Sequence, residues 1–293
     1  MTAEIGVDGR VVIVTGAGQG LGRAHALALA RAGARVVVND VGEGAGRVAA
    51  EITAAGGVAL ASAGDVADWS YGAELVAIAV DTFGGLDSLV NNAGLVRDRM
   101  LVNLSEAEWD EVMRVDLKGH FVPLRHAAAY WRDRAKAGSP VAARVVNTSS
   151  GAGLMGSVGQ ANYAAAKAGV AALTQVAAVE LARYGVTVNA IAPSARTSMT
   201  ESVFAEAMRA PEGGFDAASP DNVSPLVVWL ASTDSGDVTG RMFEASGGAV
   251  NVCDGWQHGT PEDVGRRWQP DELGPVVRDL IAKAPPPAPV YGA

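Results

Sequence analysis

Three side chains near the middle of the chain have the types and spacing needed for acid–base chemistry on an alcohol or ketone. Tyr163 and Lys167 lie four residues apart in a helical stretch, so their side chains project from one face. A tyrosine with an ordinary pKa of about 10 is a poor base at neutral pH unless a nearby cation, here Lys167, stabilises the phenolate. Ser150, thirteen residues before Tyr163, can hydrogen-bond the reacting oxygen. Each feature alone also fits an ordinary helix or loop, but together they predict proton exchange between Tyr163 and a substrate oxygen.

A glycine-rich segment near the start of the chain has the pattern of a dinucleotide-binding turn. The segment Thr15-Gly16-Ala17-Gly18-Gln19-Gly20-Leu21-Gly22 joins an apolar run to a helical stretch at 23–32. Glycines permit a tight turn and a close approach of the backbone to a pyrophosphate, and the helix N-terminus offers free N–H groups. By itself the segment also fits an ordinary strand-to-helix turn.

Asp40 follows the next apolar run, about twenty residues beyond the glycines, where the dinucleotide fingerprint has a carboxylate for the adenosine ribose. A carboxylate accepts hydrogen bonds from both ribose hydroxyls and repels a 2'-phosphate. No Arg or Lys occurs from Gly16 to Gly22 to attract such a phosphate. We therefore expect NAD rather than NADP, although Asp40 alone also fits a solvated strand end.

The elements that must position these residues alternate between short β-branched runs and Ala-rich helical stretches. The predicted strands are 10–15, 35–39, 58–61, 86–91, 143–148, 186–191 and 241–245. Strands that are apolar on both faces and alternate with helices indicate a parallel sheet covered on two sides. The expected fold is α/β, a Rossmann-like, doubly wound parallel sheet of seven strands in three layers.

We expect one catalytic domain at 1–250 and a C-terminal extension at 251–293, since no linker or repeat divides the chain. The extension contains a helical pattern at 271–283, followed by a Pro-rich, extended tail at 284–289. An irregular stretch at 198–221 is expected to form a mobile loop or short lid helices. Its apolar residues, which could wall a pocket or simply pack the lid, are Met199, Val203, Phe204, Met208 and Phe215.

Composition excludes several classes of protein. The net charge of -9 argues against a general nucleic-acid binder. A single cysteine, Cys253, cannot form an intramolecular disulfide, and the first four residues have no signal-peptide character, so a cytoplasmic location is expected. The longest apolar stretch, 161–182, is interrupted by Lys167, Gln175 and Glu180, so we expect no membrane span. The four histidines lack metal-ligand spacing, and we expect no metal.

Taken together, the motifs resemble those of the short-chain dehydrogenase/reductase family. The matching pieces are Thr15-Gly16-x-x-x-Gly20-x-Gly22, Asp65-Val66, Asn91-Asn92-Ala93-Gly94, Ser150 and Tyr163-x-x-x-Lys167, spread over about the first 250 residues. The resemblance implies a nicotinamide cofactor, no metal, and interconversion of an alcohol and a carbonyl. It also implies that the cofactor contacts Gly16, Gln19, Gly20, Leu21, Gly22, Asp40, Asp65, Val66, Asn92, Ala93, Gly94, Tyr163, Lys167, Pro193 and Thr197.

Two positions depart from the family pattern. Many members carry Asn where this chain has Asp116, and that Asn helps hold a water beside the active-site lysine. Asp116 could bind the same water, pair with Lys167 and join the proton relay as a catalytic residue, or be a structural helix residue. The second departure is Pro193-Ser194, where the family often has Pro-Gly, which leaves the register of Thr197 open by one residue.

Further stretches resemble the (3R)-3-hydroxyacyl-CoA dehydrogenase domain of peroxisomal multifunctional enzymes and related bacterial dehydrogenases. They include Val38-Asn39-Asp40, Arg97-Asp98-Arg99, Gly159-Gln160-Ala161-Asn162-Tyr163 and Met199-Thr200. This implies an NAD-dependent dehydrogenase of lipid metabolism acting on a 3-hydroxyacyl-CoA or a 17β-hydroxysteroid-like substrate. Two alternatives remain: a 3-oxoacyl thioester reductase of fatty-acid synthesis, which usually prefers NADP, and a non-catalytic NAD-binding sensor, which would not need Ser150, Tyr163 and Lys167.

The Ala-rich helix at 163–182 is apolar over more than one face. In the family such helices pair across a two-fold axis, so we expect a homodimer or homotetramer. A helix buried within a monomer is the alternative.

Overall fold

A single eight-stranded sheet forms the centre of the molecule, in a computed structural model that describes residues 5–197, 211, 213–253 and 255–292. Its strands lie in the order β3-β2-β1-β4-β5-β6-β7-β8. Their bounds are β1 Val11–Val14, β2 Arg35–Asp40, β3 Val58–Ala63, β4 Ser88–Asn91, β5 Ala143–Thr148, β6 Val186–Ser194, β7 Met242–Ser246 and β8 Ala249–Cys253. The first seven strands are parallel, which confirms the predicted α/β, Rossmann-like sheet.

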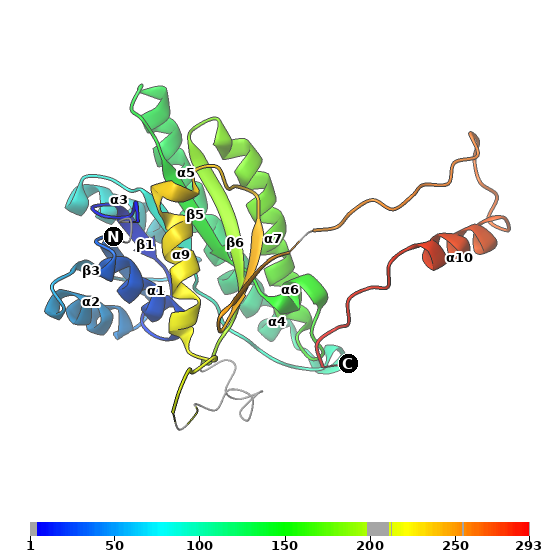
Figure 1. Ribbon diagram of the computed structural model, residues 1–293, viewed down its shortest axis with the longest axis horizontal. Helices are drawn as coiled ribbons and strands as arrows, with labels where there is room; N and C mark the ends of the chain where they lie inside the picture. The colour runs from blue at the N-terminus through cyan, green and yellow to red at the C-terminus, as the bar shows by residue number, and fades with distance from the viewer. Residues whose placement is uncertain (1–4, 198–210, 212, 254, 293) are drawn as a thin grey trace.

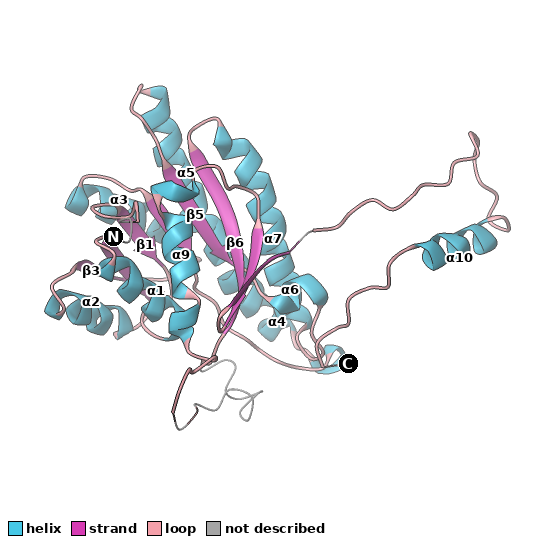
Figure 2. Cartoon of the chain, in the orientation of Figure 1, coloured by secondary structure: helices cyan, strands magenta, loops and turns pink. Residues whose placement is uncertain are grey.

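The central strands form here because most of their side chains are apolar or small and are buried on both faces. Every residue of β1, β4 and β5 is buried. Strands of this kind require helices on each side of the sheet to cover them. Figure 2 shows the magenta strands enclosed between helices, as this requirement predicts.

Two groups of helices supply the outer layers (Figure 1). One face packs against α1 (Gly20–Arg31), α2 (Gly44–Ala54) and α9 (Ser224–Ala231). The other packs against α3 (Trp69–Phe83), α5 (Gly119–Lys136) and α7 (Ala161–Ala182). The remaining elements are α4 (Glu106–Val112), the π-helix η2 (Met113–Lys118), α6 (Gly151–Met155), α10 (Leu273–Lys283) and the short 3-10 helices η1 (Leu101–Asn103), η3 (Pro220–Asn222) and η4 (Thr233–Ser235).

The order of the strands reverses between β1 and β4, which are neighbours at the centre of the sheet. Loops from these two strands leave the sheet on opposite sides, so a crevice opens at their carboxyl ends. Ligands of doubly wound α/β proteins bind at such a switch point.

The eighth strand was not expected from the sequence. β8 runs antiparallel to β7 after a two-residue turn, Gly247-Gly248, in which Gly247 has a φ of 54°. It lies at the edge of the sheet with four of its five residues exposed, so it lacks the buried apolar pattern that marks the central strands. Because β8 crosses residue 250, the sheet extends past the boundary predicted between domain and extension, and that boundary remains a prediction.

The residues after β8 leave the body of the molecule and later return to it. In Figure 1 α10 stands well away from the sheet, and no residue of this fully described helix is buried. Residues 284–289 have no helix or strand, as expected of the Pro-rich tail. Tyr291 then forms a β-bridge with Ser157, in the loop between α6 and α7.

Two other sequence predictions concern the irregular stretch and α7. Residues 198–210 and 212, including four of the five apolar lid candidates, lie outside the described residues; Phe215 is described and is exposed.

Within the described ranges, α7 is long and apolar enough to cross a membrane. Its most apolar 18-residue window has a mean hydropathy of 1.3, and 39% of that window is buried. In this structure it packs against β6, α6 and η2.

Candidate active site

A cavity of about 880 Å³ lies at the carboxyl ends of the central strands. Every residue predicted for the site lines it, from Gly16 and Asp40 at one end to Ser150 and Tyr163 at the other. The sequence motifs, which are spread over nearly 200 residues, therefore converge on one cavity.

The glycine-rich turn between β1 and α1 forms one wall of this cavity. Gly16 and Gly20 have φ values of 60° and 54°, a conformation that side-chain-bearing residues rarely adopt. A Cβ added at Gly22 would lie 2.2 Å from the Gly16 carbonyl oxygen. Glycine at these positions thus allows the turn to fold back on itself, with the free N–H groups at the start of α1 facing the cavity.

Thr15 and Asn92 brace this turn. The amides of Asn92 and Ala93 both donate to Thr15 Oγ1, at 2.9 and 3.1 Å, and Asn92 Nδ2 donates to the carbonyl oxygens of Thr15 and Gly16. The side chain of Asn92 therefore positions the turn. This role of Thr15 could not be predicted from the sequence, because its partners lie more than 70 residues away in the chain.

Acidic residues lie at the strand ends beside the turn. Asp40 Oδ2 accepts a hydrogen bond of 2.8 Å from the amide of Gly18. Asp65, after β3, forms an ion pair with Arg114, which also lines the cavity. The carboxylate of Asp40 is thus held next to the glycine turn, as the fingerprint spacing predicts.

The other end of the cavity holds Ser150, Tyr163 and Lys167. Ser150 caps the N-terminus of α6 by accepting from the amide of Ala152. Tyr163 and Lys167 lie on α7, and Lys167 Nζ is 5.6 Å from the centroid of the Tyr163 ring. The Ser149 hydroxyl donates to the Lys167 carbonyl at 2.8 Å and ties α7 to the end of β5. These contacts hold the side chains of Ser150, Tyr163 and Lys167 on neighbouring walls of the cavity.

Lys167 is buried and has two fixed partners. Its Nζ donates to the carbonyl oxygen of Thr148 at 3.0 Å and lies 3.2 Å from Asp116 Oδ2. The sequence could not reveal the backbone partner, because any residue could supply that carbonyl. Of the arrangements left open for Asp116, the structure has the direct pair with Lys167.

Asp116 lies on η2 and is fully buried. Burial raises its pKa, while Lys167 and the amide of Leu95, which donates to Oδ1 at 2.8 Å, act in the opposite direction. A Cβ at Gly94 would come within 2.8 Å of Asp116 Oδ2 and 3.3 Å of Lys167 Nζ. Glycine at position 94 therefore leaves room for the ion pair as well as for a ligand.

The pKa of Tyr163 is raised in this structure. Burial is the largest cause, and the carboxylate of Asp116 adds to it, whereas Lys167 and a hydrogen bond with Ser150 lower it. Lys167 thus acts in the direction that the sequence predicts, but burial outweighs it. The charge state of the lysine–aspartate pair consequently influences how readily Tyr163 releases its proton.

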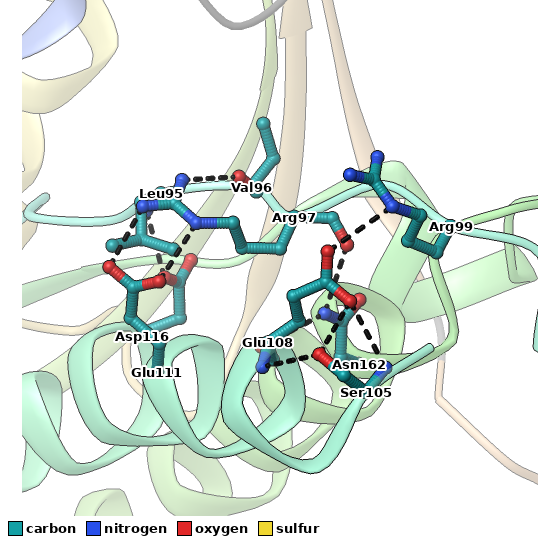
Figure 3. A network of polar contacts seen from close by, with 9 residues as sticks. All are labelled: Leu95, Val96, Arg97, Arg99, Ser105, Glu108, Glu111, Asp116 and Asn162. Atoms are coloured by element: carbon teal, nitrogen blue, oxygen red, sulfur yellow. Dashed lines mark hydrogen bonds and ion pairs between the residues drawn. The ribbon is translucent and has the colours of Figure 1, made fainter. Parts of the chain in front are cut away.

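A polar network fixes the segment that follows β4 along the rim of the cavity (Figure 3). Arg97 makes two hydrogen bonds of 2.8 Å with Glu111, and Arg99 pairs with Glu108 at 3.2 Å. Asn162, next to Tyr163, donates to the Arg97 carbonyl at 3.1 Å. The network joins this segment to both α4 and α7, so the rim and the catalytic helix are positioned together.

Pro193 and Thr197 lie after the main part of β6. Pro193 is still within the strand, paired with Ala245, so the Pro-Ser variant continues β6 to Ser194. Thr197 is buried, and a Cβ at Gly20 would lie 3.6 Å from its Cγ2. Thr197 therefore faces the glycine turn. Within the described residues, no group of three His, Cys, Asp or Glu side chains could hold a metal ion.

Comparisons with known proteins agree with this arrangement. The family model for short chain dehydrogenases matches residues 10–208. The chain is 50% identical to hydroxyacyl-CoA dehydrogenase ChsB1 of Mycobacterium tuberculosis, over 96% of this chain and 91% of that protein. It is 40% identical to the peroxisomal multifunctional enzyme type 2 of Mus musculus, of which it spans 35%. A crystal structure of a short chain dehydrogenase from Mycobacterium avium, 62% identical, superposes with a TM-score of 0.92 over 98% of this chain and all of that one. With the predicted fold confirmed and its motifs gathered in one cavity, the chain belongs to the short-chain dehydrogenase family.

Proposed function

We propose that the protein is an NAD-dependent oxidoreductase that interconverts a secondary alcohol and a ketone, with a 3-hydroxyacyl-CoA as its substrate. The observation that carries the proposal is the convergence of Ser150, Tyr163 and Lys167 on the cavity that also contains the glycine turn. A non-catalytic NAD sensor would need only the turn and Asp40.

The cavity fits a nicotinamide dinucleotide, the cofactor NAD(P) that this family uses. Gly16, Gly20 and Gly22 would leave room for a pyrophosphate beside the start of α1, and Asp40, held by the Gly18 amide, would accept hydrogen bonds from the adenosine ribose. Within the described residues, the lysine and arginine side chains that line the cavity are Arg114 and Lys167, each already paired with an aspartate. No unpaired cation there awaits a 2'-phosphate, which supports NAD over NADP.

When bound, the nicotinamide supplies the acceptor or donor for hydride. Tyr163 exchanges the proton of the substrate hydroxyl, and Ser150 donates a hydrogen bond to the same oxygen. Lys167, held by Thr148, stabilises the phenolate electrostatically and lies where it can bind the nicotinamide ribose. Most of the rate enhancement from the chain then comes from placement of these groups.

Asp116 acts in this scheme through Lys167. Its carboxylate fixes the ammonium group beside Tyr163 and raises the pKa of the tyrosine. We therefore assign Asp116 as a positioning residue that controls the proton transfer, rather than a group that touches substrate.

The substrate class rests on the relatives and on the cavity. The Mycobacterium tuberculosis relative is named a hydroxyacyl-CoA dehydrogenase, and the resemblance to that branch also leaves room for a 17β-hydroxysteroid-like substrate. A 3-oxoacyl thioester reductase is the nearest alternative, and Asp40 argues against its usual NADP preference.

The assembly and compartment are also proposed. A groove of about 810 Å³ between α5 and α7 is lined by apolar residues, among them the exposed Phe121 and Val179, and by charged residues such as Arg125 and Arg183. A second copy of the chain, related by a two-fold axis, would cover this face in a homodimer or homotetramer. We propose a cytoplasmic location, from the single cysteine in the chain.

Initial rates with NAD and NADP test the proposal. The substrates to compare are 3-hydroxyacyl-CoA thioesters of several chain lengths, a 17β-hydroxysteroid, a carrier-protein thioester and simple secondary alcohols. We expect reduction of NAD with the hydroxyacyl-CoA series. Activity on polyols alone would contradict the substrate class, and a strong NADP preference would contradict the assignment of Asp40.

A further inference from the structure

The end of the chain forms part of the catalytic cavity. Residues 290–292, called here the strap, return to the body after the exposed arm that contains α10. The amide of Val158 donates to the Tyr291 carbonyl at 2.9 Å, and the amide of Tyr291 donates to the Gly156 carbonyl at 3.2 Å. The strap is therefore held by two backbone hydrogen bonds to the loop between Ser150 and Tyr163.

The side chain of Tyr291 points at the residue next to Ser150. A Cβ added at Gly151 would lie 2.8 Å from both Cε2 and Oη of Tyr291, and its three nearest neighbours would all be atoms of that ring. Glycine at position 151 is thus what permits the ring to lie against the start of α6. Tyr291 also lines the cavity together with Ser150, Gly151 and Tyr163.

The strap joins two walls of the cavity that belong to different parts of the fold. On one side it contacts the loop between α6 and α7. On the other side, Glu244 and Asn251 of the β7–β8 hairpin line the same cavity as Tyr291. Partial burial raises the pKa of Tyr291, and the charges of Glu244 and Cys253 raise it further.

We propose that Tyr291 is a specificity-determining residue, and that its ring forms the wall against which the substrate packs beyond the carbinol carbon. The proposal rests on the proposed function, because it requires a substrate longer than the reacting centre, such as the acyl thioester. An aromatic ring at this place contributes apolar contact area to a bound substrate.

A double-mutant cycle between Tyr291 and Gly151 tests this assignment. Tyr291→Ala should raise KM for a 3-hydroxyacyl-CoA about tenfold, with kcat within about threefold of wild type, because one aromatic contact to the substrate is lost. Tyr291→Phe should behave as wild type. Gly151→Ala should also raise KM because the added methyl group displaces the ring, and it should add no further effect in the Tyr291→Ala background. Binding of NADH should be unchanged in every variant, and Val264→Ala, on the exposed arm, is the matched control.

Amide hydrogen exchange separates the strap from the proposed function. In wild type, the amides of Val158 and Tyr291 should exchange slowly, and Gly151→Ala should accelerate both. An unchanged KM in Tyr291→Ala, or an undiminished effect of Gly151→Ala in that background, would overturn the assignment of Tyr291. Wild-type protein without activity on any hydroxyacyl-CoA would instead overturn the proposed function, while the exchange rates would still decide whether the strap is docked.

Discussion

At the scale of single residues, the charge next to Tyr163 is set by a buried pair rather than by one cation. Lys167 is balanced by Asp116 at 3.2 Å, so part of its effect on the tyrosine is cancelled. Many family members have a neutral Asn at this position, and the difference should be visible in the pH dependence of the reaction.

Replacing Asp116 by Asn should move the acid limb of the kcat/KM profile for alcohol oxidation to lower pH. The carboxylate of Asp116 raises the pKa of Tyr163, so replacing it with a neutral amide lowers that pKa. The active phenolate then forms at a lower pH. Asp81→Asn, at an exposed position of α3, should leave the profile unchanged. A profile for Asp116→Asn that superposes on wild type would remove Asp116 from the proton-transfer chemistry.

The residues of the site were predictable from sequence where a side-chain type is required at a fixed spacing. The glycines, Asp40, Ser150, Tyr163 and Lys167 all line the cavity. Groups that act through the backbone, such as the Thr148 carbonyl and the Leu95 amide, leave no mark in the sequence. The sequence also did not predict that the pKa of Tyr163 is raised, because this shift depends mainly on the burial of the side chain.

At the scale of elements, the β1–α1 turn depends on glycine most strongly at position 22. A Cβ there would lie 2.2 Å from the Gly16 carbonyl and 2.5 Å from Asn92 Nδ2, in the braced part of the turn. Backbone at such a distance cannot move aside without deforming the site.

Gly22→Ala should therefore destabilise the protein by about 1–3 kcal/mol and abolish NADH binding. Gly46→Ala is the matched control, since Gly46 lies inside α2 with nothing within 4 Å of the added Cβ. That change should be neutral or stabilising by up to about 1 kcal/mol, because alanine favours helix and restricts the unfolded chain. Thermal unfolding and NADH titration measure both effects. Normal binding by Gly22→Ala would contradict the tight turn.

Seven strands could be found from the sequence because most of them are short β-branched runs followed by a helical pattern. β8 was missed because it follows β7 after only two residues, with no helical stretch between them. A signal for it does exist: two glycines at 247 and 248 between apolar runs are typical of a tight hairpin.

At the scale of the whole molecule, two exposed features lie outside the catalytic cavity. One is the groove between α5 and α7, and the other is the unburied helix α10 in the segment after β8. Where the arm and the strap lie depends on contacts far apart in sequence, and this could not be predicted from local patterns.

The groove between α5 and α7 predicts how the oligomer responds to a charge at the proposed interface. Val179 is 80% exposed in one chain, and a second copy docked on α5 and α7 would bury it. Val179→Asp should then convert the oligomer to monomers, because the carboxylate would lose its hydration when the interface forms. Light scattering coupled to gel filtration measures the mass, with Val102→Asp, at an exposed valine on η1, as the control. A monomeric wild type, or an unchanged mass for Val179→Asp, would contradict the proposed interface.

The measurement that tests the central claim most directly is turnover by Tyr163→Phe. This change removes one hydroxyl from the cavity and leaves the glycine turn, Asp40 and the Lys167–Asp116 pair in place. NADH should bind with wild-type affinity, while the rate of NAD reduction with a hydroxyacyl-CoA should fall by about 100-fold or more, the usual contribution of a general acid–base group. Turnover within threefold of wild type would show that Tyr163 does not carry the proton.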